Sequence, residues 1–317
     1  MHPFPHHYAV HAHATLEDDV MLRTPGVAPL RTATPVEFGA TGLIPSDPIK
    51  HGHKGAVGAF VIEPQGATWV EDADSRAAAT VTLPDGSTFR EFVLVVQNNV
   101  NLRFGSDVTL PTAANDDAPP TTETFFAGQA IPNTAEAEDP EDSGQKAFNY
   151  RTEPMWFRFP FAPDAPLGFT RNLVITDILT NGQVGADPET PIFTAEVGTP
   201  VRFRVVHPAG NQRNSVLTIH GHVWEREPYV AGSTKLGSNP LSMWTGARMG
   251  IGPTDHSDAL LKNGAGGAFG ILGDYLFRDV SSFLFDGGHW GIFRVVPEAA
   301  PPPPDPEPCT HPNPKKG

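Results

Sequence analysis

Residues 217–223 read Leu-Thr-Ile-His-Gly-His-Val, and residues 288–297 read Gly-His-Trp-Gly-Ile-Phe-Arg-Val-Val-Pro. The chain carries a second copy of this pair, because residues 8–14 read Tyr-Ala-Val-His-Ala-His-Ala and residues 55–64 read Gly-Ala-Val-Gly-Ala-Phe-Val-Ile-Glu-Pro. Side chains alternate along a strand, so His-x-His predicts two imidazoles on one face, where both could reach one metal. The repeat therefore predicts two copies of one β-unit.

Short β-segments are expected along the whole chain. Its 317 residues include 34 Pro and 31 Gly, which divide it into pieces too short for long amphipathic helices. Residues 92–97, Phe-Val-Leu-Val-Val-Gln, and residues 201–206, Val-Arg-Phe-Arg-Val-Val, are typical of strands. The length suffices for two domains with their own cores. We predict an all-β protein.

Charge and composition exclude several classes of partner. The formal net charge is −14, and the chain has no basic cluster beyond Lys315-Lys316, so nucleic acid and anionic membranes are poor partners. No apolar run approaches the roughly 20 residues that span a bilayer. The first residues lack the charged start and apolar core of a signal peptide. The single cysteine, Cys309, allows no intramolecular disulfide.

The two copies differ in what precedes them. Ten residues stand before the first His-x-His, whereas more than a hundred residues of β-like sequence stand before the second. We therefore predict a partial β-unit at residues 1–64 that a longer protein or another chain completes. A connector is expected at 65–76, a complete unit at 77–297, and a Pro-rich tail at 298–317.

Local signals place individual elements within these units. Pro84-Asp85-Gly86 predicts a turn between strands at 80–83 and 89–97. His207, which precedes Pro208, is expected to be structural. Further strands are predicted at residues 155–159, 173–175, 191–194, 201–206 and 291–296.

An acidic insertion interrupts the second unit at about residues 110–144. This stretch is rich in Ala, Thr and Pro, contains no Lys or Arg, and is most acidic at 136–142. A loop of this length is uncommon in a compact domain. A calcium site is one interpretation, but the acidic residues lack EF-hand spacing, so a solvated loop is the favoured prediction.

The framework of the chain resembles a known family. An apolar strand with His-Gly-His-Val, followed by a Gly-x-x-Gly-x-Phe strand, is similar to the cupredoxin domains of multicopper oxidases. Residues 191–206 are also similar to a strand pair of these domains, in which a glycine turn joins the two strands. Residues 40–50, 138–154 and 273–278 are similar, more narrowly, to large bacterial multicopper oxidases related to manganese oxidases.

This resemblance implies cupredoxin-like Greek-key β-sandwiches, one partial and one complete. It also implies copper as cofactor, oxygen as electron acceptor, and an extracytoplasmic location. The partners that it implies are further cupredoxin domains, in the same protein or in a partner chain.

The same resemblance shows which copper ligands are replaced. The last ligand block of the family, aligned on the Gly-x-x-Gly-x-Phe strand, puts Asp279 at the Cys position and His289 at the axial position. In the first copy, it puts Ser46 at the Cys position and His51 at the later His position. Cys309 matches no ligand position. A thiolate holds Cu(I) and relays electrons, so neither copy is expected to form the usual blue-copper site.

The His-x-His strands align with the upstream ligand block. His220 falls on a position of the trinuclear copper cluster, and His222 on a histidine that usually binds no metal; His11 and His13 correspond to them in the first copy. The resemblance implies a structural part of a copper-dependent oxidase, whose independent activity stays open. The candidate metal ligands are six histidines: His220, His222, His11, His13, His51 and His289.

Two other interpretations remain open. The chain could be a non-enzymatic metal-binding or scaffolding module. His220 and His222 could bind metal, or they could be half-buried imidazoles satisfied by backbone carbonyls. A cupin-like metalloenzyme is suggested by His-x-His followed by Glu at 220–227 and 11–17. Cupins also need a later histidine on a strand, and neither copy supplies one at a suitable spacing.

Overall fold

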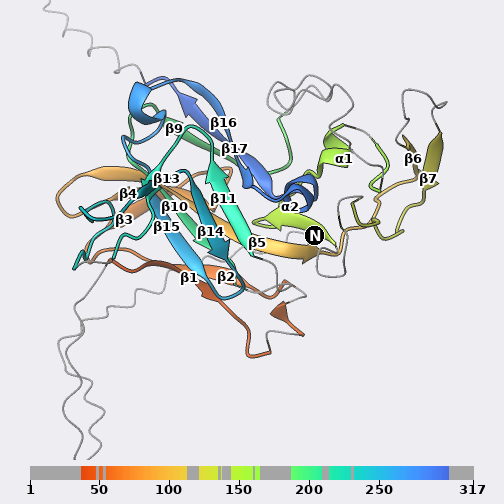
Figure 1. The fold of residues 1–317 in the computed structure, drawn as a ribbon, viewed down its shortest axis with the longest axis horizontal. Helices are drawn as coiled ribbons and strands as arrows, with labels where there is room; N and C mark the ends of the chain where they lie inside the picture. Colours follow the sequence, from red (N-terminus) through yellow and green to blue (C-terminus); the bar gives the residue numbers. More distant parts are fainter. Residues whose placement is uncertain are drawn as a thin grey trace, which may run out of the picture.

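Two β-sheets form the body of the protein (Figure 1). The structure is a computed structural model that describes residues 37–47, 50–52, 55–112, 121–134, 137, 144–159, 161–164, 187–208, 214–229 and 232–299. The first copy of His-x-His, with His11 and His13, lies outside the described residues, as do Cys309, the predicted strand at 173–175 and residues 300–317.

The first sheet has the strand order β15-β10-β5-β4-β3, and β8 joins the far end of β5. Strand β10 runs parallel to β5, and the other pairs are antiparallel. The bounds of these strands are β3 Thr68–Glu71, β4 Ala78–Thr82, β5 Thr88–Val100, β8 Gln145–Phe148, β10 Val201–Val206 and β15 His256–Leu260.

The second sheet has the order β14-β11-β16-β17-β9, with β9 parallel to β17. Successive strands alternate between the two sheets at β8 to β9, β9 to β10, β10 to β11, β14 to β15 and β15 to β16, so the two sheets form a sandwich. The bounds are β9 Ile192–Glu196, β11 Ser215–Ile219, β14 Ala247–Ile251, β16 Gly273–Asp279 and β17 Trp290–Val296.

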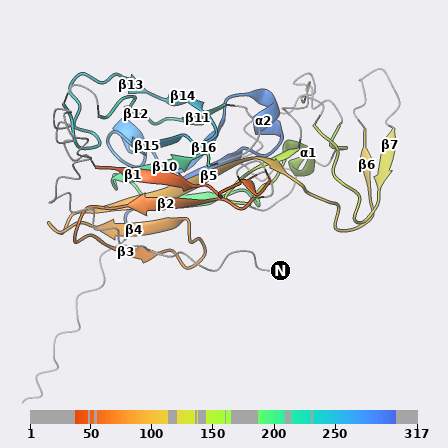
Figure 2. The ribbon, with the colours of Figure 1, turned by 90° about the horizontal axis from the view of Figure 1, so that it is seen from below.

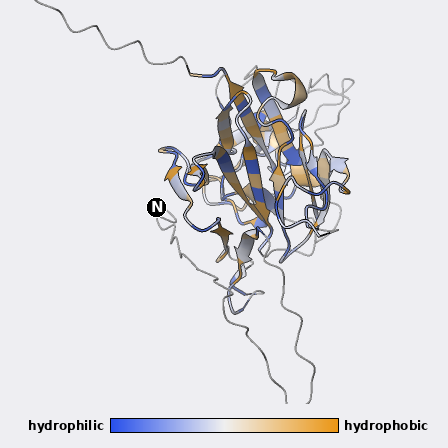
Figure 3. Cartoon of the chain, turned by 90° about the vertical axis from the view of Figure 1, so that its left-hand side faces the viewer, coloured by the Kyte–Doolittle hydropathy of each residue, from blue (hydrophilic) through white to orange (hydrophobic). Residues whose placement is uncertain are grey.

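Phenylalanines from both sheets fill the space between them. Phe92 and Phe203 come from the first sheet, and Phe193, Phe277 and Phe293 from the second. The ring centroids of Phe92 and Phe193 are 4.7 Å apart, and those of Phe203 and Phe293 are 5.6 Å apart. Hydrophobic and hydrophilic residues follow one another along the strands (Figure 3), as expected when one face of a sheet is buried.

Glycines in the Gly-x-x-Gly-x-Phe strand allow close packing at the start of β17. A Cβ on Gly291 would lie 2.2 Å from the Phe277 ring, and one on Gly288 would lie 1.9 Å from Thr152 Oγ1. Gly288 also has φ +123°, which side chains rarely adopt. In this copy, the two glycines of the motif therefore meet steric needs of the fold.

A two-stranded ribbon lies against the first sheet (Figure 2). It consists of β1, Gly39–Leu43, and β2, Gly58–Ile62, paired antiparallel. The ribbon contacts β10, β15 and β5. These contacts are on the face of the sheet opposite the core, because Phe203 and Val205 of β10 point into the core while Arg204 points to the ribbon.

A smaller lobe lies beside the sandwich. It contains the hairpin of β6, Val108–Pro111, and β7, Thr122–Phe125, together with the short helices α1, Met155–Arg158, and α2, Ser282–Asp286. Phe104 and Phe125 stack at 4.7 Å and pack with Trp156 of α1 in a separate hydrophobic cluster.

Short elements complete the fold. They are β12, Trp224–Glu225, paired with β13, Trp244–Thr245, and a 3-10 turn, η4, Gly267–Phe269. Among the helices in the part of the chain that the structure describes, none has the length and apolarity that crossing a membrane requires.

The prediction of an all-β sandwich is confirmed. The predicted turn at Pro84-Asp85-Gly86 joins β4 to β5 as expected. The strand predicted at 155–159 is wrong, because this segment forms α1 and buries Met155 and Trp156 from a helical turn. Five residues are too few to distinguish the helical period from the strand period.

Two stretches predicted as loop or connector contain strands. Strand β3 lies within 65–76 and forms the edge of the first sheet, and β7 lies within the insertion at 110–144. The most acidic part of that insertion, 136–142, is described only at residue 137. The division into a partial unit at 1–64 and a complete unit at 77–297 stays a prediction.

Candidate functional site

The second His-x-His motif is a turn. Strand β11 ends at Ile219, and Gly221 has φ +72°, a conformation that ends the alternation of side chains. A Cβ on Gly221 would also lie 2.8 Å from the Tyr275 ring. As a result His220 is exposed and His222 is buried. The prediction that the two imidazoles share one face of a strand is wrong.

His222 uses both ring nitrogens to bind backbone. Its Nδ1 donates to the carbonyl oxygen of His220 at 2.9 Å, and its Nε2 accepts from the amide of Gly266 at 3.0 Å. This pattern requires the neutral ring with the proton on Nδ1. Burial lowers the pKa of His222 and so favours the same form. His222 thus joins the turn after β11 to the loop before η4.

Asp279 and His289 lie next to each other at one end of the second sheet. The amide of Asp279 donates to the carbonyl oxygen of His289 at 2.9 Å, and Asp279 Oδ2 is 3.9 Å from His289 Nδ1. The carboxylate of Asp279 accepts from the amides of Val216 at 3.2 Å and Ser281 at 3.0 Å. Burial raises the pKa of Asp279. Its oxygens therefore hold β11 and the start of α2 to the end of β16.

His289 is fully buried and stacks on Phe148, with ring centroids 4.8 Å apart. Its Nε2 donates to the carbonyl oxygen of Gln97 at 3.0 Å. Burial, aided by the charge of Lys146, lowers the pKa of His289 to about 3. The ring is neutral at physiological pH and connects the second sheet to β5 of the first.

A further buried polar group adjoins these residues. His207 Nδ1 donates to the carbonyl oxygen of Ile251 at 3.0 Å, and its Nε2 is 3.2 Å from Asn98 Nδ2. Lys146 Nζ donates to the carbonyl oxygen of Asn98 at 2.5 Å. Burial lowers the pKa of His207. The prediction that His207 is structural agrees with these contacts.

These donors do not fit a copper ion. Copper needs imidazole nitrogens with a free lone pair, or thiolates. Both nitrogens of His222 are engaged by backbone, and the oxygens of Asp279 accept from amides. His289 offers a single nitrogen, Nδ1, without a hydrogen-bond partner among the described residues, and it lies beside the buried charge of Lys146. Within the described ranges, no group of three or more His, Cys, Asp and Glu side chains is arranged to hold a metal ion.

The other candidate histidines are at the surface. His220 lies in the turn after β11, where partial desolvation of its ring and the charge of Arg278 lower its pKa. His51 is exposed in the loop between β1 and β2. Metal binding by either residue stays a prediction.

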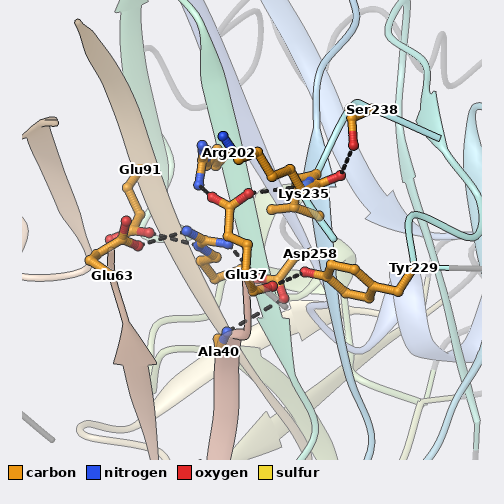
Figure 4. A network of polar contacts seen from close by, with 12 residues as sticks. Glu37, Ala40, Glu63, Glu91, Arg202, Tyr229, Lys235, Ser238 and Asp258 are labelled. Atoms are coloured by element: carbon orange, nitrogen blue, oxygen red, sulfur yellow. Dashed lines mark hydrogen bonds and ion pairs between the residues drawn. The ribbon is translucent and has the colours of Figure 1, made fainter. Parts of the chain in front are cut away.

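Sequence reasoning missed an ionic cluster between the ribbon and the first sheet (Figure 4). Arg204 of β10 is fully buried and donates to Glu91 at 2.7 Å, Asp258 at 3.0 Å and Glu63 at 2.6 Å. A neighbouring ion pair joins Arg202 of β10 to Glu37. The signal in the sequence was the two arginines in an otherwise apolar strand, because alternation puts both on one face.

Comparisons with known proteins give little further guidance. No protein-family model matches the chain, and no curated protein matches it. Among solved structures, the chain is similar to a protein described as a multicopper oxidase from Campylobacter jejuni, a metallo-oxidase, with 12% sequence identity and a TM-score of 0.25. That match covers 32% of this chain and 20% of the other. A likeness of this extent carries no weight for function, which has to be inferred from the residues.

Proposed function

We propose that this chain is a cupredoxin-like structural module of an assembly of the multicopper-oxidase type, related to the manganese-oxidase-like bacterial enzymes. The observation that carries this proposal is the contact between Asp279 and His289. The alignment of ligand motifs puts these residues at the Cys and axial positions of a mononuclear copper site. Residues that the family alignment brings to one site are neighbours in this fold.

In this module, the residues at those positions hold the fold together. The Asp279 carboxylate binds two backbone amides, and the neutral His289 ring binds the backbone of the other sheet. A thiolate that conducts electrons has been replaced by a carboxylate that fixes loops. Copper sites and oxygen reduction would then belong to other cupredoxin domains of the assembly, located outside the cytoplasm.

Copper loading tests the proposal. Purified protein is incubated with excess copper, weakly held metal is removed with a chelator, and copper per chain is measured together with oxygen uptake in the presence of a reductant. We expect less than stoichiometric copper, no copper-dependent oxygen uptake and an unchanged midpoint of thermal unfolding. Stoichiometric copper with oxygen-coupled turnover would show that the chain is an oxidase by itself.

The exposed His220 supports a second candidate, a non-enzymatic metal-binding module. In the same experiment, the variant His220→Ala separates the two. Copper that the wild type retains without oxygen uptake, and that this variant loses, favours the metal-binding module. A cupin-like site is not supported, because His222 has no free ring nitrogen and Glu227 is exposed beside Arg226.

A further inference from the structure

The ionic cluster under the ribbon contains more carboxylates than cations. Glu63, Glu91 and Asp258 surround the single guanidinium of Arg204, and their side chains are 10%, 10% and 2% exposed. Arg202 does not offset this excess, because it pairs with Glu37. Three ionised carboxylates around one buried arginine would leave two uncompensated charges, which burial makes costly.

The hydrogen bonds of Glu63 indicate where a bound proton reduces the cost of these buried charges. Glu63 accepts from Arg204 through Oε1, whereas its Oε2 is buried and has no hydrogen-bond partner among the described residues. Glu91 is the neighbouring carboxylate on β5, and it also binds Arg204. A proton shared between Glu63 and Glu91 supplies a donor and neutralises one charge. In agreement, burial raises the pKa of Glu63 to about 8 from an ordinary 4.5, with the charge of Glu91 adding to the effect.

The cluster is also an attachment point of the ribbon. Glu63 follows the last residue of β2, and Gly39, which pairs with Ile62, begins β1. The amide nitrogen of Ala40, the second residue of β1, lies 3.4 Å from Asp258 Oδ2. Gly39 has φ +79°, and a Cβ there would lie 2.1 Å from Asp258 Oδ2, so the ribbon fits closely at this point.

The remaining titratable groups around the cluster come from the ends of β1 and β15 and from the loop after β12. Tyr229 donates to the carbonyl oxygen of Glu37, and burial raises its pKa, so it stays protonated in mildly alkaline solution. Burial also raises the pKa of Asp258, against the opposing effect of Arg204. His256, on β15, acts on Asp258 through its charge and stacks on Phe38.

We propose that the proton shared by Glu63 and Glu91 is a latch that fastens the β1–β2 ribbon to the first sheet, and that its loss as pH rises favours detachment of the ribbon. Glu63 in a detached ribbon is solvated and has its ordinary acidity. Between about pH 4.5 and pH 8, Glu63 therefore takes up a proton when the ribbon attaches to the sheet. The attached state is most stable, relative to the detached state, below this pH window. The opening equilibrium rises about tenfold per pH unit across the window and levels off above it.

Amide hydrogen exchange of the ribbon tests the latch. Protection factors of β1 and β2 amides, corrected for the intrinsic pH dependence of exchange, are measured from pH 5 to pH 9. We expect them to fall about tenfold per unit until about pH 8 and then stay constant. The amides of β17 in the other sheet, which do not depend on the ribbon, report global stability, including the change expected from His289 below pH 6.5.

Two variants distinguish a latch from a general loss of stability. Glu63→Gln keeps a neutral side chain that can donate to Glu91, so its ribbon protection is expected to be independent of pH. Glu37→Gln weakens the neighbouring pair with Arg202, so it lowers protection at every pH while keeping the wild-type slope. Wild-type protection that does not change between pH 5 and pH 8, or a Glu63→Gln variant that keeps the wild-type slope, would overturn the proposal.

Discussion

Acid is expected to destabilise the fold through His289. The folded state holds this ring neutral down to a pKa of about 3, whereas the unfolded chain takes up a proton near 6.5. Above pH 6.5 the His289 ring is neutral in both states, and its contribution to the free energy of unfolding is fully present. As pH falls from 6.5 toward 3 this contribution is lost, because only the unfolded state gains the proton in that range. Each pH unit within the window costs about 1.4 kcal/mol. Between pH 7 and pH 5 the loss from this one group is about 2 kcal/mol.

The variant His289→Gln isolates this contribution, because an amide can still donate to the Gln97 carbonyl oxygen but does not titrate. Free energies of unfolding are measured by urea denaturation at pH 7 and pH 5 for both proteins. The wild type should lose about 2 kcal/mol more than the variant over this interval, although the variant is less stable at pH 7. His51→Gln, at an exposed loop position, is the matched control and should follow the wild type. The reasoning is refuted if His289→Gln loses as much stability on acidification as the wild type.

Three further predictions concern packing and the turn after β11. Phe293→Ala removes a ring from the centre of the sandwich and should lower the free energy of unfolding by about 3–5 kcal/mol in urea denaturation. Gly291→Ala drives a Cβ to 2.2 Å from the Phe277 ring and should lower the thermal midpoint clearly, while Gly105→Ala, with nothing within 4 Å, should leave it near that of the wild type. His222→Ala leaves the Gly266 amide without its acceptor and should cost about 1–3 kcal/mol, and faster exchange of that amide would locate the effect.

Much of the strand framework was predictable from local patterns. The turn at Pro84-Asp85-Gly86 and the β-branched, aromatic run at 201–206 carry their signals within a few residues. The strand predicted at 155–159 is wrong because the burial of this segment depends on distant elements: Trp156 packs with the hairpin of β6 and β7, whereas Met155 and Phe159 pack with α2, β16 and β17. Strand β8, all of whose residues are buried, was not predicted, because its short Gln-Lys-Ala-Phe sequence has no strand pattern.

The candidate site, like the strand framework, was predicted only in part. Alignment of the motifs indicated that Asp279 and His289 belong to one site, and they are neighbours in the structure. Alternation along a strand predicted the wrong arrangement of His220 and His222, because the glycine between them adopts a left-handed conformation. What each ring nitrogen binds could not be inferred, since the partners are the backbone of Gly266 and of Gln97, 192 residues from His289.

The sequence alone was sufficient for the all-β class, for the repeated motifs and for the lack of a thiolate at either aligned copper position, because these depend on residue type and short spacing. Tertiary structure alone decided that His222 and His289 are bound by backbone and that Arg204 gathers three carboxylates. Glu63 and Glu91 come from positions 141 and 113 residues away from that arginine. Burial of such groups, and the pKa shifts that follow, depend on which distant segments the fold packs together.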